Sequence, residues 1–447
     1  MATKAKSVSL TNDAVKILNG IRNQASSNYK DYIPVATDGS SIKEIGAIVM
    51  QFEALQNEFV SALINRIGLT VITSRSYENP IAMFKKGMLE FGESVEEVFV
   101  NIAEAYEFDP EDAETSLYKR YIPDVKSAFH VMNFQKFYPV TVSEAQLKQA
   151  FLSADGLYDL VSKITESLYT AMNNDEFLVM KYVMARRILN GATYPIQIDG
   201  TDTTKAVTTI KGASNDIEFL SDKYNPAGVY THSDKDRQYL IVTSDFDAKM
   251  DVETLATAFN MDKASFLGHK VMIDGFDKLD VKRLSKLLAD NPYYTEPTDA
   301  ELKALHEIPA ILVDEDFFMV YDNLLQFKQQ ENAKGLYWNY FLHSWKTFST
   351  SPYASAITFV PEEPTVVSVA VNPTAVTVAI NGTSQVLATV ETTGFASKEC
   401  AWTIDNSDVA SVDSRGVVTG LSAGTATLTV TSLFDETKSA TATITVA

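Results

Sequence analysis

A series of short strands at the carboxyl end constrains the fold of this chain more than any other feature. Between residues 364 and 447, β-branched residues alternate with small polar ones, and turn residues interrupt them at regular intervals. Asn372-Pro373 ends the first strand, and Asn381-Gly382, with its preference for positive φ, ends the second. Six or seven such strands cover their apolar faces in two packed sheets, so the segment predicts a β-sandwich.

The alternation also predicts which side chains form the core of this sandwich. Trp402 is the largest candidate, and we expect Ile404, Leu428 and Val446 to bury against it. The residues expected on the inner face of the first strand are Val367, Val369 and Val371. Proline and charge at Pro361-Glu-Glu-Pro364 predict a linker, so we expect the sandwich to fold by itself and a chain ending at Val360 to fold without it.

The order of motifs in this segment resembles the group 2 bacterial immunoglobulin-like (Big-2) domain. The matching residues are Trp402, Val409-Ala410, Val412, Gly416-Val-Val-Thr-Gly420 and Gly424-Thr-Ala-Thr427. Such modules occur in adhesins, enzymes and phage particles, so the resemblance assigns no activity. The function depends on the other residues.

Composition excludes several classes of protein. The 447 residues carry 38 Lys and Arg against 58 Asp and Glu, a formal charge of −20, and a surface this acidic repels the phosphate backbone of nucleic acids. Cys400 is the only cysteine, which favours a reduced folding environment. The amino-terminal residues lack the apolar run of a secretion signal, and no stretch of about eighteen apolar residues occurs, so we expect no export and no membrane span.

The first hundred residues predict an arm, a helix and a projecting loop. Residues 1–40 are polar and contain Gly20, Pro34 and Gly39, which indicates an extended arm. Ser41 and Glu44 form a capping-box pattern before apolar residues that recur at helical spacing up to residue 68. Residues 69–73 and 97–101 are strand-like and flank a polar, glycine-containing stretch, so residues 69–108 predict a two-stranded loop.

The middle of the chain predicts one long helix and then a mixed α/β region. Leucine, valine, isoleucine and methionine recur at helical spacing through residues 155–191, with Asp155 as a start and Gly191 as an end. Beyond it we expect a helix at residues 251–259, another at 298–307 capped by Thr298 and Glu301, and strands at 310–313 and 317–321.

These elements, in this order, resemble the major capsid proteins of phi-29-like short-tailed phages. The fragments that carry the resemblance are Arg66-Ile-Gly-Leu69, Asn79-Pro80, Phe84-Lys-Lys-Gly87, Ala258-Phe-Asn-Met261, Ile273-Asp-Gly-Phe276, Phe318-Met-Val-Tyr-Asp-Asn323 and Gly335-Leu-Tyr-Trp-Asn-Tyr340. The resemblance implies an α+β Hong Kong 97 capsid fold over residues 1–360, followed by the Big-2 sandwich at 364–447.

Within that fold, the resemblance implies an N-terminal arm at 1–40, an E-loop at 69–108 that lies over a neighbouring subunit, a peripheral domain with a spine helix at 155–191, and an axial domain at about 195–335. It further implies a major capsid protein without catalytic activity that assembles in the host cytoplasm. Hexamers and pentamers would form an icosahedral or prolate shell around double-stranded DNA, without sequence recognition, metal or cofactor. The expected partners are a scaffolding protein and a portal protein, and the Big-2 module is a candidate for contact with the host surface.

The candidate contacts between subunits lie in the projecting loop. They are Lys85, Lys86, Glu93 and Glu96, whose charges would meet opposite charges on a neighbour. Some shells of this fold crosslink through a loop lysine, but nothing in this sequence identifies the acidic and amide partners that the reaction needs.

Two other functions remain open at this stage. A phage tail or head-fibre protein, or a carbohydrate-active enzyme with an immunoglobulin-like accessory module, would also carry such a sandwich. The nucleotide-binding, zinc-protease and esterase motifs are absent, and the five histidines show no metal-ligand spacing. The cluster Asp314-Glu-Asp316 and the aromatic run 337–341 with Trp345 are better explained as strand rim and core than as catalytic or sugar-binding groups.

Overall fold

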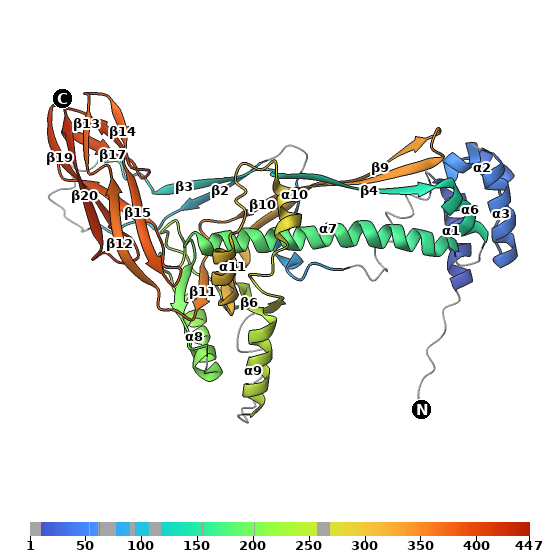
Figure 1. Ribbon diagram of the computed structural model, residues 1–447, viewed down its shortest axis with the longest axis horizontal. Helices are drawn as coiled ribbons and strands as arrows, with labels where there is room; N and C mark the ends of the chain where they lie inside the picture. The colour runs from blue at the N-terminus through green and yellow to red at the C-terminus, as the bar shows by residue number, and fades with distance from the viewer. Residues whose placement is uncertain are drawn as a thin grey trace.

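The computed structural model describes residues 10–52, 54–60, 62, 77–89, 94–106, 118–152, 156–200, 202–256 and 269–447. The subunit is elongated along one long helix, α7, with short helices at one end of it and an all-β domain at the other (Figure 1). The predicted helix start at Asp155 and the residues 63–76, 90–93, 107–117 and 257–268 lie outside the described part.

The helix α7 (Gly156–Leu189) confirms the long helix predicted at 155–191, which we call the spine helix. Its 34 residues span about 50 Å, and Asn173-Asn-Asp175 does not interrupt it. It ends at Gly191, whose φ of +68° is a left-handed conformation that glycine adopts readily. In the described ranges, no helix combines the length and the apolar composition needed to cross a membrane.

The predicted extended arm is wrong over the described residues 10–40. Instead the chain forms α1 (Leu10–Gln24), α2 (Ser27–Tyr32) and the start of α3 (Gly39–Gln51). Ala14, Ile17, Leu18 and Ile21 recur at helical spacing on α1 and are buried. They pack in one cluster with the far end of α7 and with α6 (Glu144–Leu152), so this apolar stripe outweighs the polar composition.

The helix predicted from Ser41 to residue 68 begins earlier, at Gly39, and is interrupted. Asp38, not Ser41, is the N-cap: its carboxylate accepts from the Ser40 and Ser41 amides, and the Ser41 hydroxyl accepts from the Asp38 amide. At Phe52 the backbone is extended, with φ −123° and ψ 114°, and residues 54–60 are helical again.

A four-stranded sheet lies along α7 in the order β1 (Lys85–Met88), β9 (Phe318–Asn332), β10 (Tyr337–Thr350) and β4 (Phe134–Ser143). Trp338, Tyr340 and Leu342 on β10 are buried in one cluster with Leu168 and Met172 of α7. Side chains on a strand alternate between faces, so every second residue of β10 faces away from the helix.

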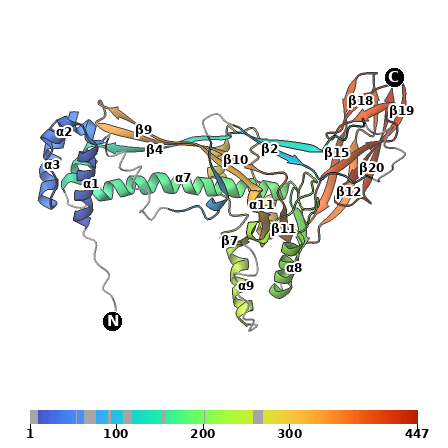
Figure 2. The same ribbon diagram turned by 180° about the vertical axis from the view of Figure 1, so that it is seen from behind.

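A five-stranded sheet lies near the C-terminal half of α7, in the order β5 (Tyr194–Gln197), β11 (Ala356–Val360), β8 (Ala310–Asp314), β6 (Gln238–Thr243) and β7 (His269–Ile273). The helices α8 (Thr203–Asp216) and α9 (Ser244–Ala256) project from it (Figure 2). The helices α10 (Val281–Leu288) and α11 (Asp299–His306) contribute to the core shared with α7.

Several local predictions in this region can be compared directly with the structure. The capping box of Thr298 and Glu301 and the strand at 310–313 are confirmed. The helix expected at 251–259 begins earlier, at Ser244. Residues 318–332, expected in the axial domain, form β9 in the sheet along α7, where β9 pairs with β10 through fourteen residue pairs.

The carboxyl-terminal domain is a sandwich of short strands. One sheet is β13 (Ala375–Val378), β20 (Ser439–Val446), β19 (Gly424–Ser432) and β16 (Cys400–Ile404). The others are β12 (Thr365–Asn372) with β15 (Leu387–Thr393), and β14 (Thr383–Gln385) with β18 (Val417–Gly420) and β17 (Ala410–Val412).

This domain has a core of its own, in which the structure places the four predicted residues. Leu428 and Val446 are buried, and Trp402 and Ile404 are half-buried against the same cluster. The inward face predicted for β12 is wrong at Val367, which is 53% exposed, while Val366 is buried. A β-bulge between Val366 and Ser368 shifts the alternation by one residue.

Candidate assembly surface

Several exposed apolar side chains of the described strands lie on a two-stranded ribbon. Its strands are β2 (Val95–Val100) and β3 (Val125–His130), which pair antiparallel with Val100 opposite Val125. Strand β2 overlaps the strand expected at 97–101, but its partner is β3, and the strand expected at 69–73 lies outside the described residues. The stretch between them contains β1, which pairs with β9 in the sheet along α7.

The two faces of the ribbon differ in exposure. On one face Val98, Val100, Val125 and Phe129 are 55%, 58%, 52% and 65% exposed. Glu96, a predicted contact residue, is exposed on the same face, opposite Phe129. Contiguous exposed apolar side chains of this kind mark interaction surfaces in soluble proteins.

The other face is fixed to the body of the subunit. The Phe99 ring stacks on the Tyr353 ring at 5.4 Å, and the Lys126 ammonium donates to the Ala227 carbonyl at 2.6 Å. His130 is buried, with Nε2 3.1 Å from the Glu97 carboxylate and Nδ1 2.8 Å from the Ser349 hydroxyl. The body thus holds one face of the ribbon and leaves the apolar face open.

The spine helix supports this attachment through Arg187. Its guanidinium donates to the Ser351 carbonyl at 2.9 Å, and the Ser351 hydroxyl donates to Glu97 at 2.6 Å. Burial lowers the pKa of Arg187 to about 10, and the nearby Glu97 carboxylate opposes that shift. Arg187 remains charged at neutral pH and connects the end of α7 to the base of the ribbon.

The described residues beyond the paired strands continue the exposed apolar surface. The Tyr106 and Tyr121 rings lie 4.7 Å apart, and the Lys119 ammonium lies 5.8 Å and 5.4 Å from their centres. Tyr118 is 90% exposed and Ile122 is 84% exposed. This part of the ribbon therefore combines aromatic, apolar and cationic groups that few contacts within the subunit cover.

A second open surface is the face of the four-stranded sheet turned away from α7. Phe137 of β4 is 54% exposed there, and its ring lies 5.7 Å from the rings of both Phe341 and His343. Among the described residues of β9, β10 and β4 that pair with one another, none on this face is an aspartate or a glutamate. The residues of this face are Leu324, Gln326, Lys328, Gln330, Asn332, Tyr337, Asn339, Phe341, His343, Trp345, Gln135, Phe137, Pro139, Thr141 and Ser143.

The predicted contacts Lys85 and Lys86 do not lie on the ribbon. The Lys85 ammonium is 3.1 Å from Glu176 and 2.7 Å from Asp322, and Lys86 is 2.5 Å from Asp316. Burial lowers the pKa of Lys85, but the two carboxylates outweigh it and hold the pKa above its usual value. Both lysines pair with carboxylates of their own chain, and their contact with a neighbouring subunit stays a prediction. Glu93 lies outside the described residues.

The carboxylate cluster 314–316 and the aromatic run 337–341 take part in ion pairs and in core packing. Asp314 is buried, accepts from the Ser233 hydroxyl at 2.5 Å and pairs with Arg237 at 3.2 Å, so this residue is more deeply buried than the expected strand rim. In the aromatic run 337–341, Trp338 and Tyr340 are core residues, whereas Phe341 is partly exposed on the open face.

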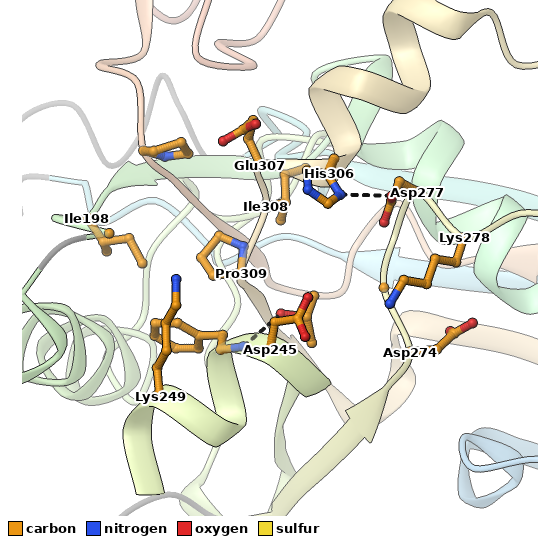
Figure 3. A pocket seen from close by; sticks show the side chains of 15 residues that line it. Ile198, Asp245, Lys249, Asp274, Asp277, Lys278, His306, Glu307, Ile308 and Pro309 are labelled. Carbon is orange, nitrogen blue, oxygen red and sulfur yellow. Dashed lines mark hydrogen bonds and ion pairs between the residues drawn. The ribbon is translucent and has the colours of Figure 1, made fainter. Parts of the chain in front are cut away.

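A polar cleft of about 260 Å³ lies beside α9 and α11 (Figure 3). His306 Nδ1 lies 2.9 Å from the Asp277 carboxylate, and this hydrogen bond raises the pKa of His306. Lys249, Lys278 and Asp245 also line the cleft, so opposite charges face one another. Across the parts of the chain that the structure describes, no three His, Cys, Asp or Glu side chains gather as metal ligands.

Comparison with known proteins identifies the two families that the chain matches. Residues 18–360 match the Phi29-like phage major capsid protein family, and residues 365–444 match the group 2 bacterial Ig-like domain. The major capsid protein of Bacillus phage B103 is 34% identical over 433 residues, 95% of this chain and 90% of that protein. The major capsid protein of Bacillus phage PZA is 33% identical over 401 residues, 88% of this chain and 83% of that protein.

A solved structure shares the fold at low sequence identity. The capsid structure of Staphylococcus phage Andhra superposes with a TM-score of 0.51 at 13% identity, over 65% of this chain and 86% of that chain. The chain therefore shares its fold with a capsid protein whose sequence is only 13% identical.

Proposed function

This chain belongs to the phi29-like phage major capsid protein family, and we propose that its copies join into a shell through the open face of the β2–β3 ribbon. It is a major capsid protein of a tailed phage and a structural component of the virion. The observation that carries the proposal is the ribbon itself, fixed to the subunit on one face and apolar and exposed on the other.

The arrangement of elements supports a Hong Kong 97 fold. In this proposal α7 and the four-stranded sheet form the peripheral domain, and the five-stranded sheet with α8 and α9 forms the axial domain. The ribbon at 95–130 is the E-loop, and the helices α1 to α3 take the place of the extended arm. The axial domain then ends near Asp314 and resumes at β11.

The receiving surface on the neighbour is the open sheet face that carries Phe137 and Phe341. Exposed aromatic side chains occur on both surfaces, and the absence of carboxylates along this described face leaves Glu96 of the incoming ribbon without a like charge to repel it. Full burial of an exposed valine or phenylalanine contributes about 1.5–3 kcal/mol, and a half-exposed side chain of the ribbon gains roughly half of that. A closed shell repeats the contact in every subunit.

The remaining partners follow from the role of a shell protein. We infer hexamers and pentamers, a scaffolding protein and a portal protein as assembly partners, and assembly in the host cytoplasm. The charge of −20 suits a shell that encloses double-stranded DNA without recognising its sequence. Contact between the immunoglobulin-like domain and the host surface remains a hypothesis, and we propose no catalytic role for the chain.

The proposal is tested by comparing Val100→Asp with Val367→Asp during co-expression with the scaffolding protein. Both valines are exposed, at 58% on the ribbon and 53% on the immunoglobulin-like domain, so neither change disturbs a core. We expect Val367→Asp to give normal particles and Val100→Asp to give folded subunits that do not close into shells. Normal particles from Val100→Asp would place the ribbon face outside the contact.

A further inference from the structure

The immunoglobulin-like domain sits directly on the C-terminal end of α7 (Figure 1). A Cβ atom built on Gly191 would lie 2.9 Å from the Ala396 carbonyl oxygen and 3.1 Å from the Cα of Ser397. The loop that follows β15 therefore meets the helix end backbone to backbone. A linker that merely tethered the two domains would not require such close contact.

Phe395 in this loop extends the contact into the main core. Its side chain packs against the buried cluster that contains Met184, Ala185 and Ile188 of α7. It does not belong to the cluster that forms the core of the sandwich. The neighbouring Ala396 is fully buried. One aromatic side chain of the second domain thus packs against the core of the first.

The backbone of the loop supports the same conclusion. Phe395 has a φ of +60°, a left-handed conformation that is unfavourable for a non-glycine residue and persists where the surroundings determine it. Gly394 before it has a φ of +57°, and a Cβ atom there would lie 2.7 Å from the Pro364 nitrogen. The contacts with the linker and the helix end provide the interactions that hold this strained geometry.

A second contact lies at the start of β5. The Tyr194 ring is 6.0 Å from the Phe434 ring of the immunoglobulin-like domain and 5.3 Å from the Tyr224 ring. The Lys223 ammonium lies 4.6 Å from the centre of the Tyr194 ring. Two separate contacts fix the orientation of a rigid body more firmly than a single linker does.

We propose that the immunoglobulin-like domain is a docked and fixed part of the subunit, positioned by Phe395, and that its docking stabilises the C-terminal end of α7. This goes beyond the proposed function, which depends on the ribbon and on the open face of the four-stranded sheet. It also replaces the expectation of an independent module: a chain ending at Val360 would expose the apolar side chains that Phe395 covers. We therefore expect that truncation to be less stable than the full chain.

The test compares Phe395→Ala with Leu387→Ala in the full-length chain. Leu387 lies on β15 and is 60% exposed, so its truncation is the matched control. We expect Phe395→Ala to accelerate amide hydrogen exchange at Ile188–Ala192 by on the order of tenfold, which corresponds to about 1.4 kcal/mol. We also expect faster cleavage by a glutamate-specific protease at the exposed Glu362-Glu363. The control should change neither.

Phe395→Leu, which retains an apolar side chain, should show a smaller effect than Phe395→Ala. If Phe395→Ala fails to fold while Leu387→Ala folds, the coupling is also supported, because Phe395 lies outside the core of the sandwich. Unchanged exchange at the end of α7 together with unchanged cleavage of the linker, in a folded Phe395→Ala chain, would overturn the proposal.

Discussion

Glu176 on α7 and Lys346 on β10 form an ion pair of 2.5 Å in which each side chain is only 3% exposed. Lys85 on β1 and Asp322 on β9 complete a cluster of two cations and two anions. The Asn79 amide donates to Glu176 at 2.8 Å and satisfies its other oxygen. The cluster joins the spine helix to three strands of the sheet, and its charges balance.

Removal of one charge from this cluster should be more harmful than removal of two. We expect Lys346→Met to lower the free energy of unfolding by about 3–5 kcal/mol, because an uncompensated carboxylate remains buried. The double change Lys346→Met with Glu176→Gln should recover part of that loss. Urea unfolding measures both, and Lys136→Met is the control, since its partner Asp290 is 93% exposed. Equal losses in Lys346→Met and the control would contradict the account.

The same cluster predicts a dependence of stability on pH. Burial raises the pKa of Glu176 and Asp322, but Lys346 and Lys85 outweigh it and hold both values below normal. A carboxylate with a depressed pKa stabilises the fold fully above its unfolded pKa, about 4, and loses that contribution as the pH falls through the folded value. We expect the urea concentration at the unfolding midpoint to decrease as the pH is lowered below about 4. The decrease should be less steep in Glu176→Gln. Equal slopes would exclude Glu176 as a source of the effect.

Reversal of the two β1 lysines should impair folding rather than assembly. Lys85→Glu with Lys86→Glu would place new carboxylates beside Glu176, Asp322 and Asp316, so we expect little soluble subunit. Glu96→Lys, on the exposed ribbon face, should instead leave the subunit folded and change only its assembly. Circular dichroism and sedimentation separate the two results. A well-folded double lysine variant would show that the β1 ion pairs contribute little.

Local patterns explain which parts of the fold the sequence predicts. The spine helix has an apolar stripe and a glycine end, and α11 has its Thr298 cap, so both follow from nearest neighbours along the chain. Strand β8, with five buried residues, is likewise apparent as an apolar run. The motif order around Trp402 predicts the sandwich for the same reason.

Distant partners explain what the sequence does not predict. Lys85 meets Glu176 and Asp322 because β1 pairs with β9, which lies more than 200 residues away along the chain. Without that pairing, the sequence pattern indicates only an exposed lysine in a polar loop. Strand β2 pairs with β3, and no hairpin motif in the intervening sequence 101–124 indicates this pairing. The bulge at Val366 and the docking of Phe395 depend equally on contacts outside their own segments.

The most direct test of the central claim is electron cryomicroscopy of the particles that form when the full chain is co-expressed with its scaffolding protein. The account predicts closed shells in which the ribbon face with Val98, Val100 and Phe129 lies on the open sheet face of a neighbouring subunit. Trimers or soluble monomers in place of shells, or shells in which that ribbon face remains in solvent, would contradict it.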